Sequence, residues 1–245
     1  AAKISGVPVI VSSNPRRAAG VISAWFYSEP MRDLYSVGVT GTNGKTTVTT
    51  LLHQIMSLAG RESGLIGTVE TRIGEEVIAS KRTTPESSDL QALSAMMRER
   101  HMRNLVMEVS SHAIALERIR GSHFAVVAFT NLSQDHLDFH KTFDNYIKAK
   151  KGFFDMLPKS AFALTNTDDK NGMVMLQNTK AYKKTYALKQ MADFKAKIIE
   201  NKFSGLHLEV DQTDVYFKMV GSFNAYNLLA AYGTAILLGQ DQLQV

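Results

Sequence analysis

A glycine-rich segment between an apolar run and a helical pattern constrains the fold of this chain more than any other feature of its sequence. The apolar run is Tyr35–Thr40, and the glycine-rich segment that follows it is Gly41-Thr42-Asn43-Gly44-Lys45-Thr46-Thr47. Helical periodicity begins within this segment, at Lys45. A strand, a glycine turn and a helix in this order are typical of a phosphate-binding loop. There, backbone N–H groups bind an anion, a lysine reaches the outer phosphates and a hydroxyl enters a Mg²⁺ shell. The sequence therefore predicts a nucleoside triphosphate site at residues 41–47.

The match to the full Walker pattern is imperfect. That pattern has a glycine five residues before Gly44, where this chain has Val39, so the loop is a shortened form. The alternative interpretation is an ordinary glycine-rich turn between a strand and a helix.

Composition places the chain among ordinary globular proteins. Its 245 residues are 44% apolar and 21% charged, enough for one large domain. No apolar stretch is long enough to cross a bilayer and no signal peptide is visible, so we expect no membrane insertion. The absence of cysteine excludes disulfides and thiolate metal sites, and it is compatible with the cytoplasm. A net charge of +5 with scattered lysines favours an anionic small substrate over nucleic acid.

From residue 35 onward, apolar runs alternate with helical periodicity. This alternation predicts an α/β fold, with a mostly parallel sheet and helices on both of its faces. A change to period two near the end predicts a small antiparallel hairpin. The predicted elements are helices over 45–59, 88–101 and 225–238, the last capped by Asn224, buried strands over 104–109 and 124–129, and hairpin strands over 206–210 and 215–220.

The first 34 residues are too few to form a core of their own. We expect a short strand over 7–11 and a helix over 15–27, with Pro15 suited to the first helical turn. Residues 1–34 are therefore assigned to the end of a preceding domain or a linker, and residues 35–245 to the nucleotide-binding domain.

Glu108 ends an apolar strand and precedes Val109-Ser110-Ser111-His112. Because ligands of open α/β sheets gather at the carboxyl ends of strands, we expect Glu108 beside the phosphate loop, where a carboxylate can hold Mg²⁺. The alternative is a surface glutamate at a strand end. His112 is better explained as a helix-start histidine than as a catalytic one.

The loop 130–138 follows another buried strand and contains three possible ligands. A neutral imidazole at His136 can bind a second divalent ion, while Asp135 and Asp138 can orient that ring or cap the following turn. A polar connector stabilised by Asx turns is the alternative.

Lys150 falls at the centre of an apolar stripe on a helix predicted from about residue 142, whereas Lys148 and Lys151 point elsewhere and are expected in solvent. An ammonium group in a core is costly. Lys150 must therefore have a partner, extend to solvent, lose its proton or be modified, for example as a metal-binding carbamate. A packed stem with a solvated head explains the position equally well.

Six motifs, in this order and at this spacing, resemble those of the Mur ligases over nearly the whole chain: residues 41–47, 83–85, 108–112, 131–138, 146–150 and 223–227. Within that family the chain resembles the members that add the third amino acid, L-lysine or meso-diaminopimelate, to UDP-MurNAc-L-Ala-D-Glu. The resemblance implies a cytoplasmic, monomeric, ATP-dependent carbon–nitrogen ligase of peptidoglycan synthesis that works through an acyl phosphate. It implies ATP and two Mg²⁺ ions as cofactors, and UDP-MurNAc-dipeptide and a diamino acid as partners.

The resemblance also implies roles for particular residues. Catalytic and metal-binding roles are implied for Lys45, Thr46, Glu108, His136 and Lys150, the last as a carbamate. Nucleotide contacts are implied for Gly41, Thr42, Asn43, Gly44, Lys45, Thr46, Thr47, Asn224 and Asn227. Contacts with the UDP-sugar peptide are implied for Thr83, Thr84, Ser110 and Arg118, while Leu116 departs from relatives that have a substrate-contacting glutamine there.

Two alternatives stay open. A ligase like folylpolyglutamate synthetase shares the loop and the modified lysine, although the motifs at 83–85 and 110–112 favour the Mur ligases. A non-catalytic P-loop module would make Glu108, His136 and Lys150 incidental. The resemblance further implies that the C-terminal domain and most of the N-terminal domain are absent from these residues, so we expect the chain to be inactive alone. The choice between the two diamino acids then lies outside it.

Overall fold

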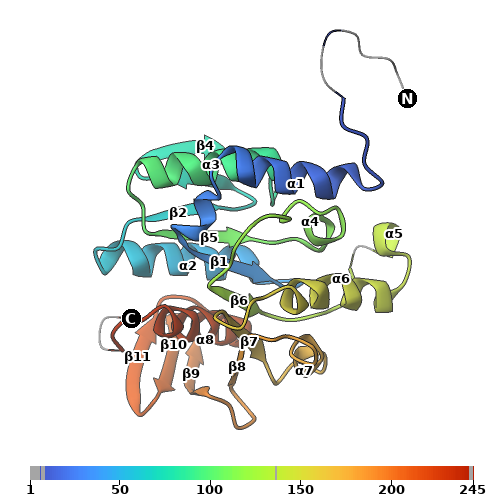
Figure 1. Ribbon diagram of the computed structural model, residues 1–245. Helices are drawn as coiled ribbons and strands as arrows, with labels where there is room; N and C mark the ends of the chain where they lie inside the picture. Colours follow the sequence, from blue (N-terminus) through green and yellow to red (C-terminus); the bar gives the residue numbers. More distant parts are fainter. Residues whose placement is uncertain (1–5, 7–8, 136, 243–244) are drawn as a thin grey trace.

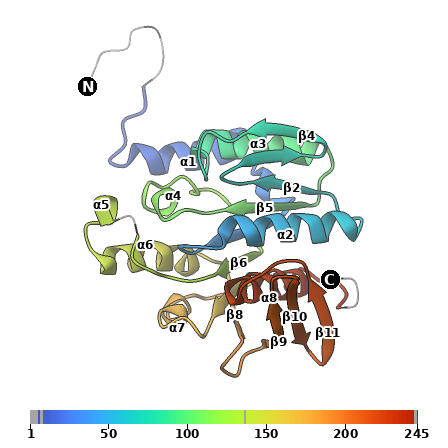
Figure 2. The same ribbon diagram turned by 180° about the vertical axis from the view of Figure 1, so that it is seen from behind.

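The computed structural model describes residues 6, 9–135, 137–242 and 245, and over these residues it shows one 11-stranded sheet between layers of helices (Figures 1 and 2). The strand order is β11-β10-β9-β8-β7-β6-β1-β5-β2-β3-β4. The strands from β2 across to β9 pair in parallel, and antiparallel pairs join β2-β3-β4 at one edge and β9-β10-β11 at the other. The predicted fold class is confirmed.

The bounds of the elements follow. The strands are β1 Tyr35–Thr40, β2 Ser63–Ile66, β3 Glu70–Ile73, β4 Glu76–Ala79, β5 Asn104–Glu108, β6 Val126–Phe129, β7 Phe162–Asn166, β8 Tyr182–Ala187, β9 Phe194–Lys202, β10 Gly205–Val210 and β11 Thr213–Phe217. The helices are α1 Pro15–Phe26, α2 Lys45–Leu58, α3 Ser87–Glu99, α4 Ser111–Ala115, α5 Leu137–His140, α6 Phe143–Asp155, α7 Gly172–Met175 and α8 Ser222–Leu237, with a 3-10 turn η1 at Pro30–Arg32.

The two faces of the sheet carry separate cores because successive side chains of a strand point to opposite faces. Val37 and Val39 of β1 pack with α2 and α8 on one face. Leu105 and Met107 of β5 face the other way, into a core shared with α3 and α6. The central strands are therefore apolar on both faces, as the continuous apolar runs predict.

Gly38 brings α6 close to the central strand. A Cβ atom at this position would lie 2.5 Å from Cζ of Phe153, so only glycine allows the Phe153 ring to rest on β1. The same helix carries Lys150 one turn earlier, which directs that lysine toward the loop after β1.

The N-terminal helix is confirmed, whereas the strand predicted before it is not. Asn14 caps α1 by accepting a hydrogen bond from the N–H of Arg17 at 3.0 Å, and the helix packs on α3. Residues 7 and 8 lie outside the described residues. Residues 9–11 form no strand and run away from the body of the molecule (Figure 1), because no strand within the described residues lies beside them to pair with their backbone groups. The assignment of residues 1–34 to a preceding domain stays a prediction.

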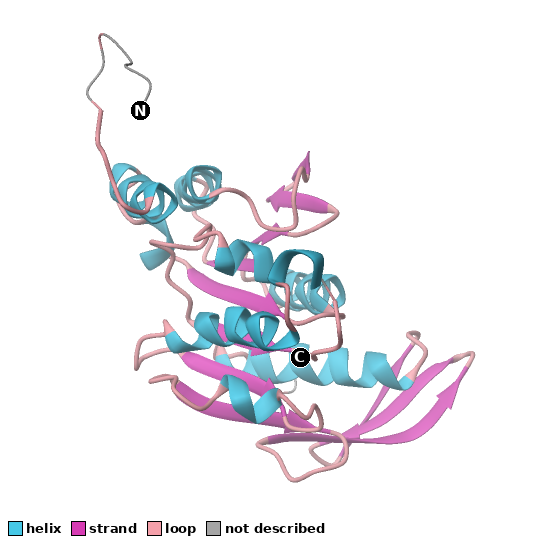
Figure 3. Cartoon of the chain, turned by 90° about the vertical axis from the view of Figure 1, so that its right-hand side faces the viewer, coloured by secondary structure: helices cyan, strands magenta, loops and turns pink. Residues whose placement is uncertain are grey.

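The predicted hairpin is confirmed, and β9 extends it to three antiparallel strands that project from one end of the molecule (Figure 3). Asp211 and Gln212 form its turn with φ of 48° and 68°, as tight hairpin turns require. The cap predicted for the last helix is wrong. Gly221 is the N-cap, and Asn224 lies inside the first turn with its Nδ2 donating to the carbonyl of Val220 at 2.8 Å.

None of the helices in the described part of the chain combines the length and apolar content that crossing a bilayer requires.

Candidate nucleotide and metal site

The loop between β1 and α2 has the backbone of a phosphate-binding turn. Gly44 adopts φ of +87° and Gly41 φ of +155°. A Cβ atom at Gly44 would lie 2.3 Å from Oδ1 of Asn227, and one at Gly41 would lie 1.9 Å from Oγ1 of Thr130. Both glycines are thus required by close approach of other side chains as well as by backbone conformation. The first Walker glycine is absent because Val39 still belongs to β1, where its side chain is fully buried.

Two cavities meet at this loop, because Asn43, Gly44 and Thr47 line both of them. One of about 350 Å³ is lined by residues 41–47 together with Thr68, Thr83, Glu108, Ser110, Ser111, Tyr146 and Lys150. The other, of about 540 Å³, is lined by Asn43, Gly44, Thr47, Asn131, Asn166, Asp168, Asp169, Phe223, Tyr226 and Asn227. We call them the phosphate cavity and the outer cavity.

Lys45 lies in the phosphate cavity at the start of α2. Its Nζ donates to the carbonyl of Gly41 at 3.0 Å and to that of Thr42 at 2.7 Å. Burial lowers the pKa of this ammonium below its usual value, and the carboxylates of Glu108 and Asp135 oppose the shift. A cation held at the mouth of the loop can interact with phosphate oxygens without reorganising the backbone.

Glu108 ends β5 inside the same cavity, and its side chain is only 1% exposed. Its Oε1 accepts from Thr46 Oγ1 at 2.9 Å and from the N–H of Thr68 at 2.7 Å, and its Oε2 accepts from Thr68 Oγ1 at 3.0 Å. A buried carboxylate beside two hydroxyls is a set of hard oxygen donors, which fits Mg²⁺. The structure therefore places Thr46 and Glu108 together, as the sequence predicts, and their role as metal ligands stays a prediction.

Lys150 is buried on α6, with 1% of its surface exposed. Its Nζ donates to the carbonyl of Gly41 at 2.9 Å and lies 4.7 Å from the centre of the Tyr146 ring. Burial holds the pKa of this amine well below its usual value, Lys45 adds to the shift, and Asp135 opposes it. The interpretation with a solvated head is wrong, because the head group ends on the phosphate loop.

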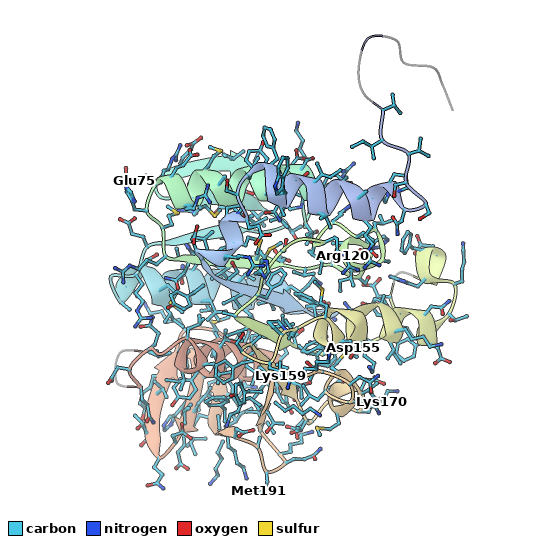
Figure 4. The ribbon with its side chains drawn as sticks, viewed as in Figure 1. Glu75, Arg120, Asp155, Lys159, Lys170 and Met191 are labelled. Carbon is cyan, nitrogen blue, oxygen red and sulfur yellow. The ribbon has the colours of Figure 1, made fainter. Side chains whose placement is uncertain are left out.

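The neighbouring lysine also differs from expectation. Lys151 is not solvated, since its side chain is 12% exposed and its Nζ donates to Asp155, labelled on α6 in Figure 4, at 2.7 Å.

His136, the predicted ligand of a second ion, lies outside the described residues. Within the described part of the chain, no group of three or more histidine or acidic side chains is arranged to hold a metal. Two earlier residues of this loop bind the backbone of the phosphate loop. Asn131 accepts from the N–H of Asn43 and donates to its carbonyl, both at 3.0 Å, and Thr130 donates to the same carbonyl at 2.6 Å.

The residues predicted to hold the UDP-sugar peptide divide into two pairs. Thr83 and Ser110 line the phosphate cavity. Thr84 is buried, and its hydroxyl donates to the carbonyl of Glu108 at 2.9 Å. Arg118 does not line the cavity; its Nη1 donates to the carbonyl of Thr84 at 3.3 Å, and its Nε lies 3.1 Å from Glu86. Thr84 and Arg118 thus support the backbone around the site.

The two predicted nucleotide-contacting asparagines also differ. Asn227 lines the outer cavity beside Gly44, and its Nδ2 donates to Oδ1 of Asn224 at 3.1 Å. Asn224 itself is half-buried and lines neither cavity.

Sequence reasoning missed two residues that shape the phosphate cavity. Thr68 holds both oxygens of Glu108 from the connection between β2 and β3, and the hydroxyl of Tyr146 lies 3.1 Å from that of Thr42. The position of Thr68, just beyond a buried strand at the carboxyl edge of the sheet, was an available signal. Tyr146 belongs to the apolar stripe around Lys150 and to the motif at 146–150, and neither pattern predicts that its hydroxyl lies beside the phosphate loop.

A strand, a glycine turn and a helix, with a buried carboxylate on the adjacent strand, define a P-loop α/β domain. Comparison with known proteins identifies its family. Residues 39–235 match the model of the Mur ligase middle domain. The chain belongs to the Mur ligase family.

Relatives and solved structures agree with this assignment. Proteins named UDP-N-acetylmuramoyl-L-alanyl-D-glutamate--2,6-diaminopimelate ligase match 99% of this chain at 49% identity in Phocaeicola vulgatus and 95% of it at 41% identity in Bacillus velezensis. The chain covers 50% of each, so it spans about half the length of these curated relatives.

A solved structure of a ligase with that name superimposes with a TM-score of 0.84 at 27% identity, over 99% of this chain and 52% of that one. An Acinetobacter baumannii ligase named for D-alanyl-D-alanyl addition shares the fold, with a TM-score of 0.72 at 18% identity over 96% of this chain and 49% of its own.

Proposed function

We propose that this chain is the ATP-binding domain of a ligase that joins 2,6-diaminopimelate to UDP-MurNAc-L-Ala-D-Glu. The names of relatives at 41–49% identity support the substrates and favour diaminopimelate over lysine. The observation that carries the proposal is the phosphate cavity, in which the loop 41–47, a buried carboxylate and two lysines converge.

Phosphoryl transfer needs positioning and charge neutralisation more than covalent help from the protein. The proposed reaction starts with attack of the substrate carboxylate on the γ-phosphorus of ATP, which forms an acyl phosphate and releases ADP. The amine of the diamino acid then attacks the acyl carbon and displaces phosphate. The N–H groups of the loop and the ammonium of Lys45 would hold the triphosphate in line with the carboxylate.

Mg²⁺ would neutralise charge on the phosphate oxygens, and Thr46 and Glu108 are the residues that would hold it. Glu108 is fixed for this task because Thr68 holds both of its oxygens. Asp135 and His136 belong to the sequence segment 130–138, which would serve a second ion, and that ion stays a prediction.

Lys150 is suited to carbamylation. An amine whose pKa is lowered by burial is largely unprotonated at lower pH than an exposed lysine, and the unprotonated amine is the form that reacts with CO₂. The product would be an anion beside Lys45, replacing the repulsion between two ammonium groups with attraction. Modification would thus remove the cost of a buried cation at this position.

Thr83 and Ser110, which line the phosphate cavity, would hold the peptide carboxylate near the loop. The incoming amine and the uridine group would be held by the parts of the relatives that this chain does not span. A cytoplasmic, monomeric enzyme stays our prediction.

Calorimetric titration of the chain with ATP, with and without Mg²⁺, tests the nucleotide site. We expect Mg²⁺-dependent binding that Lys45→Ala weakens at least tenfold, whereas Lys148→Ala, on the exposed side of α6, leaves it unchanged. Equal binding by both variants would refute the site.

Amide ligation requires a protein of the full length of the relatives. Such a protein should consume ATP with UDP-MurNAc-dipeptide and diaminopimelate and be much slower with lysine. Lys150→Ala should remove most of this activity, and full activity of that variant in bicarbonate-free and bicarbonate-rich buffer alike would contradict the carbamate role.

A further inference from the structure

The turn after β7 makes hydrogen bonds with two other loops, and no sequence motif predicts these contacts. It comprises residues 166–169, next to Lys170, which Figure 4 labels at the start of the α7 region. Two adjacent carboxylates in this turn, Asp168 and Asp169, accept hydrogen bonds from different parts of the structure. Their side chains therefore serve different loops although they are neighbours.

Asp169 anchors the loop after β6. Its Oδ2 accepts from the N–H of Leu132 at 2.8 Å, while its Oδ1 accepts from the N–H of Asn171 at 2.8 Å. Asn166 adds a second anchor, because its Nδ2 donates to the carbonyl of Thr130 at 3.1 Å. The backbone on both sides of Asn131 is thus fixed to the turn after β7.

The anchored loop is the one that holds the phosphate loop from outside. Asn131 bonds the N–H and the carbonyl of Asn43 through its side chain, and its own carbonyl accepts from the N–H of Thr42 at 2.8 Å. The N–H of Ser133 donates to the Thr42 hydroxyl at 3.0 Å. Hydrogen bonds and the backbone of residues 131–133 therefore connect Asp169 to residues 42 and 43.

Asp168 instead makes its hydrogen bonds beside the outer cavity. Its oxygens accept from the N–H groups of Leu188 and Lys189, at 2.8 and 2.9 Å, and from the hydroxyl of Tyr226 at 2.9 Å. These bonds fix the connection between β8 and β9 and one wall of the outer cavity. They make no contact with the phosphate loop.

We propose that Asp169 is a positioning residue that sets the phosphate-loop backbone through Leu132 and Asn131. The inference rests on the proposed nucleotide site. Loss of the carboxylate frees the loop after β6, and with it the backbone of residues 42 and 43, whose N–H groups donate to Asn131. The N–H groups that follow, at Gly44 and the start of α2, then lose their fixed direction. These are the groups that would bind the outer phosphates, so the loss should scale with the number of phosphates on the ligand.

Competition titrations against a fluorescent ATP analogue, using ATP and AMP, test this on the chain itself. For Asp169→Ala we expect ATP to bind about tenfold more weakly and AMP less than about threefold more weakly, since a hydrogen bond to a charged group has about this effect. Asp168→Ala is the matched control, from the same turn, and should weaken ATP and AMP by the same factor.

Equal factors for ATP and AMP in Asp169→Ala, or no change in either, would overturn the inference. Absence of ATP binding by the unaltered chain would instead refute the proposed function, so the two failures are distinguishable.

A double-mutant cycle keeps the test valid if Asp169→Ala also lowers the melting temperature. Asn131→Ala removes the two side-chain hydrogen bonds to Asn43, which are part of the path through which Asp169 is inferred to act. In that background, Asp169→Ala should weaken ATP binding by a smaller factor than it does in the unaltered chain, because part of the path is already lost. Fully additive losses would show that Asp169 acts by another route.

Discussion

The carboxylate of Glu108 allows structural support and metal binding to be separated by one isosteric change. Three hydrogen bonds reach it, from Thr46 Oγ1 and from the N–H and Oγ1 of Thr68. In Glu108→Gln the amide oxygen can replace Oε1 and accept two of them. The new NH₂ group then faces Thr68 Oγ1, a hydroxyl that accepts as readily as it donates.

No buried polar group loses its partner in Glu108→Gln, so the free energy of unfolding should change by less than about 1 kcal/mol. The Glu108→Ala variant should be much less stable. It leaves the N–H of Thr68 without its acceptor and opens a void, which should cost about 2–4 kcal/mol and lower the melting temperature by several degrees.

Metal-dependent binding should follow the opposite pattern. A unit charge about 4 Å from another contributes about 4 kcal/mol at an effective dielectric of 20. A neutral amide at position 108 loses this electrostatic attraction to Mg²⁺. Solvent compensates for part of the loss, and we still expect Mg²⁺-dependent ATP affinity to fall at least about tenfold. Both variants should therefore lose Mg²⁺-dependent binding, while only Glu108→Ala loses stability.

Scanning calorimetry measures the first quantity, and ATP titration with and without Mg²⁺ measures the second. The reasoning is refuted if Glu108→Gln binds MgATP as tightly as the unaltered chain, or if it melts as early as Glu108→Ala.

Three further predictions follow from the same structure. Thr68→Val keeps the N–H but removes the hydroxyl bond to Glu108, so it should cost about 1–2 kcal/mol of stability and weaken MgATP binding a few-fold in calorimetry. Gly44→Ala should abolish nucleotide binding, whereas Gly60→Ala, at similar φ with nothing within 4 Å, should cost only about 1 kcal/mol in urea unfolding and leave binding intact.

The third concerns pH. The pKa of Lys150 is lower in the folded than in the unfolded chain, so the unfolded chain binds more protons between those two values, and the free energy of unfolding should rise with pH there. Urea unfolding from pH 7 to 9 in CO₂-free buffer should show this rise. Lys150→Met should flatten it and Lys151→Met should not; an identical slope in Lys150→Met would contradict the assignment.

Local patterns were sufficient to predict the elements that build the site. The glycine turn before Lys45, the apolar run ending at Glu108 and the stripe around Lys150 each express a period or a turn chemistry within about fifteen residues. The hairpin and the last helix were found for the same reason. These elements meet because the carboxyl ends of parallel strands share one edge.

Long-range contacts could not be predicted in this way. The hydrogen bond between Thr68 and Glu108 joins residues 40 positions apart in the sequence, and that between Asn43 and Asn131 joins residues 88 positions apart. Strand order decides which loops become neighbours, and periodicity does not encode it. The strand predicted near Val9 is not found for a related reason. A local run of apolar residues favours a strand, but it does not supply a partner strand.

The bonds that fasten the phosphate loop to its neighbour have a consequence for the energetics of ligand capture. Asn43 is held through its N–H and its carbonyl, and Thr42 through its N–H and its hydroxyl. A receptor segment that is preorganised in this way loses little conformational entropy when an anion arrives, so more of the contact energy is retained as affinity.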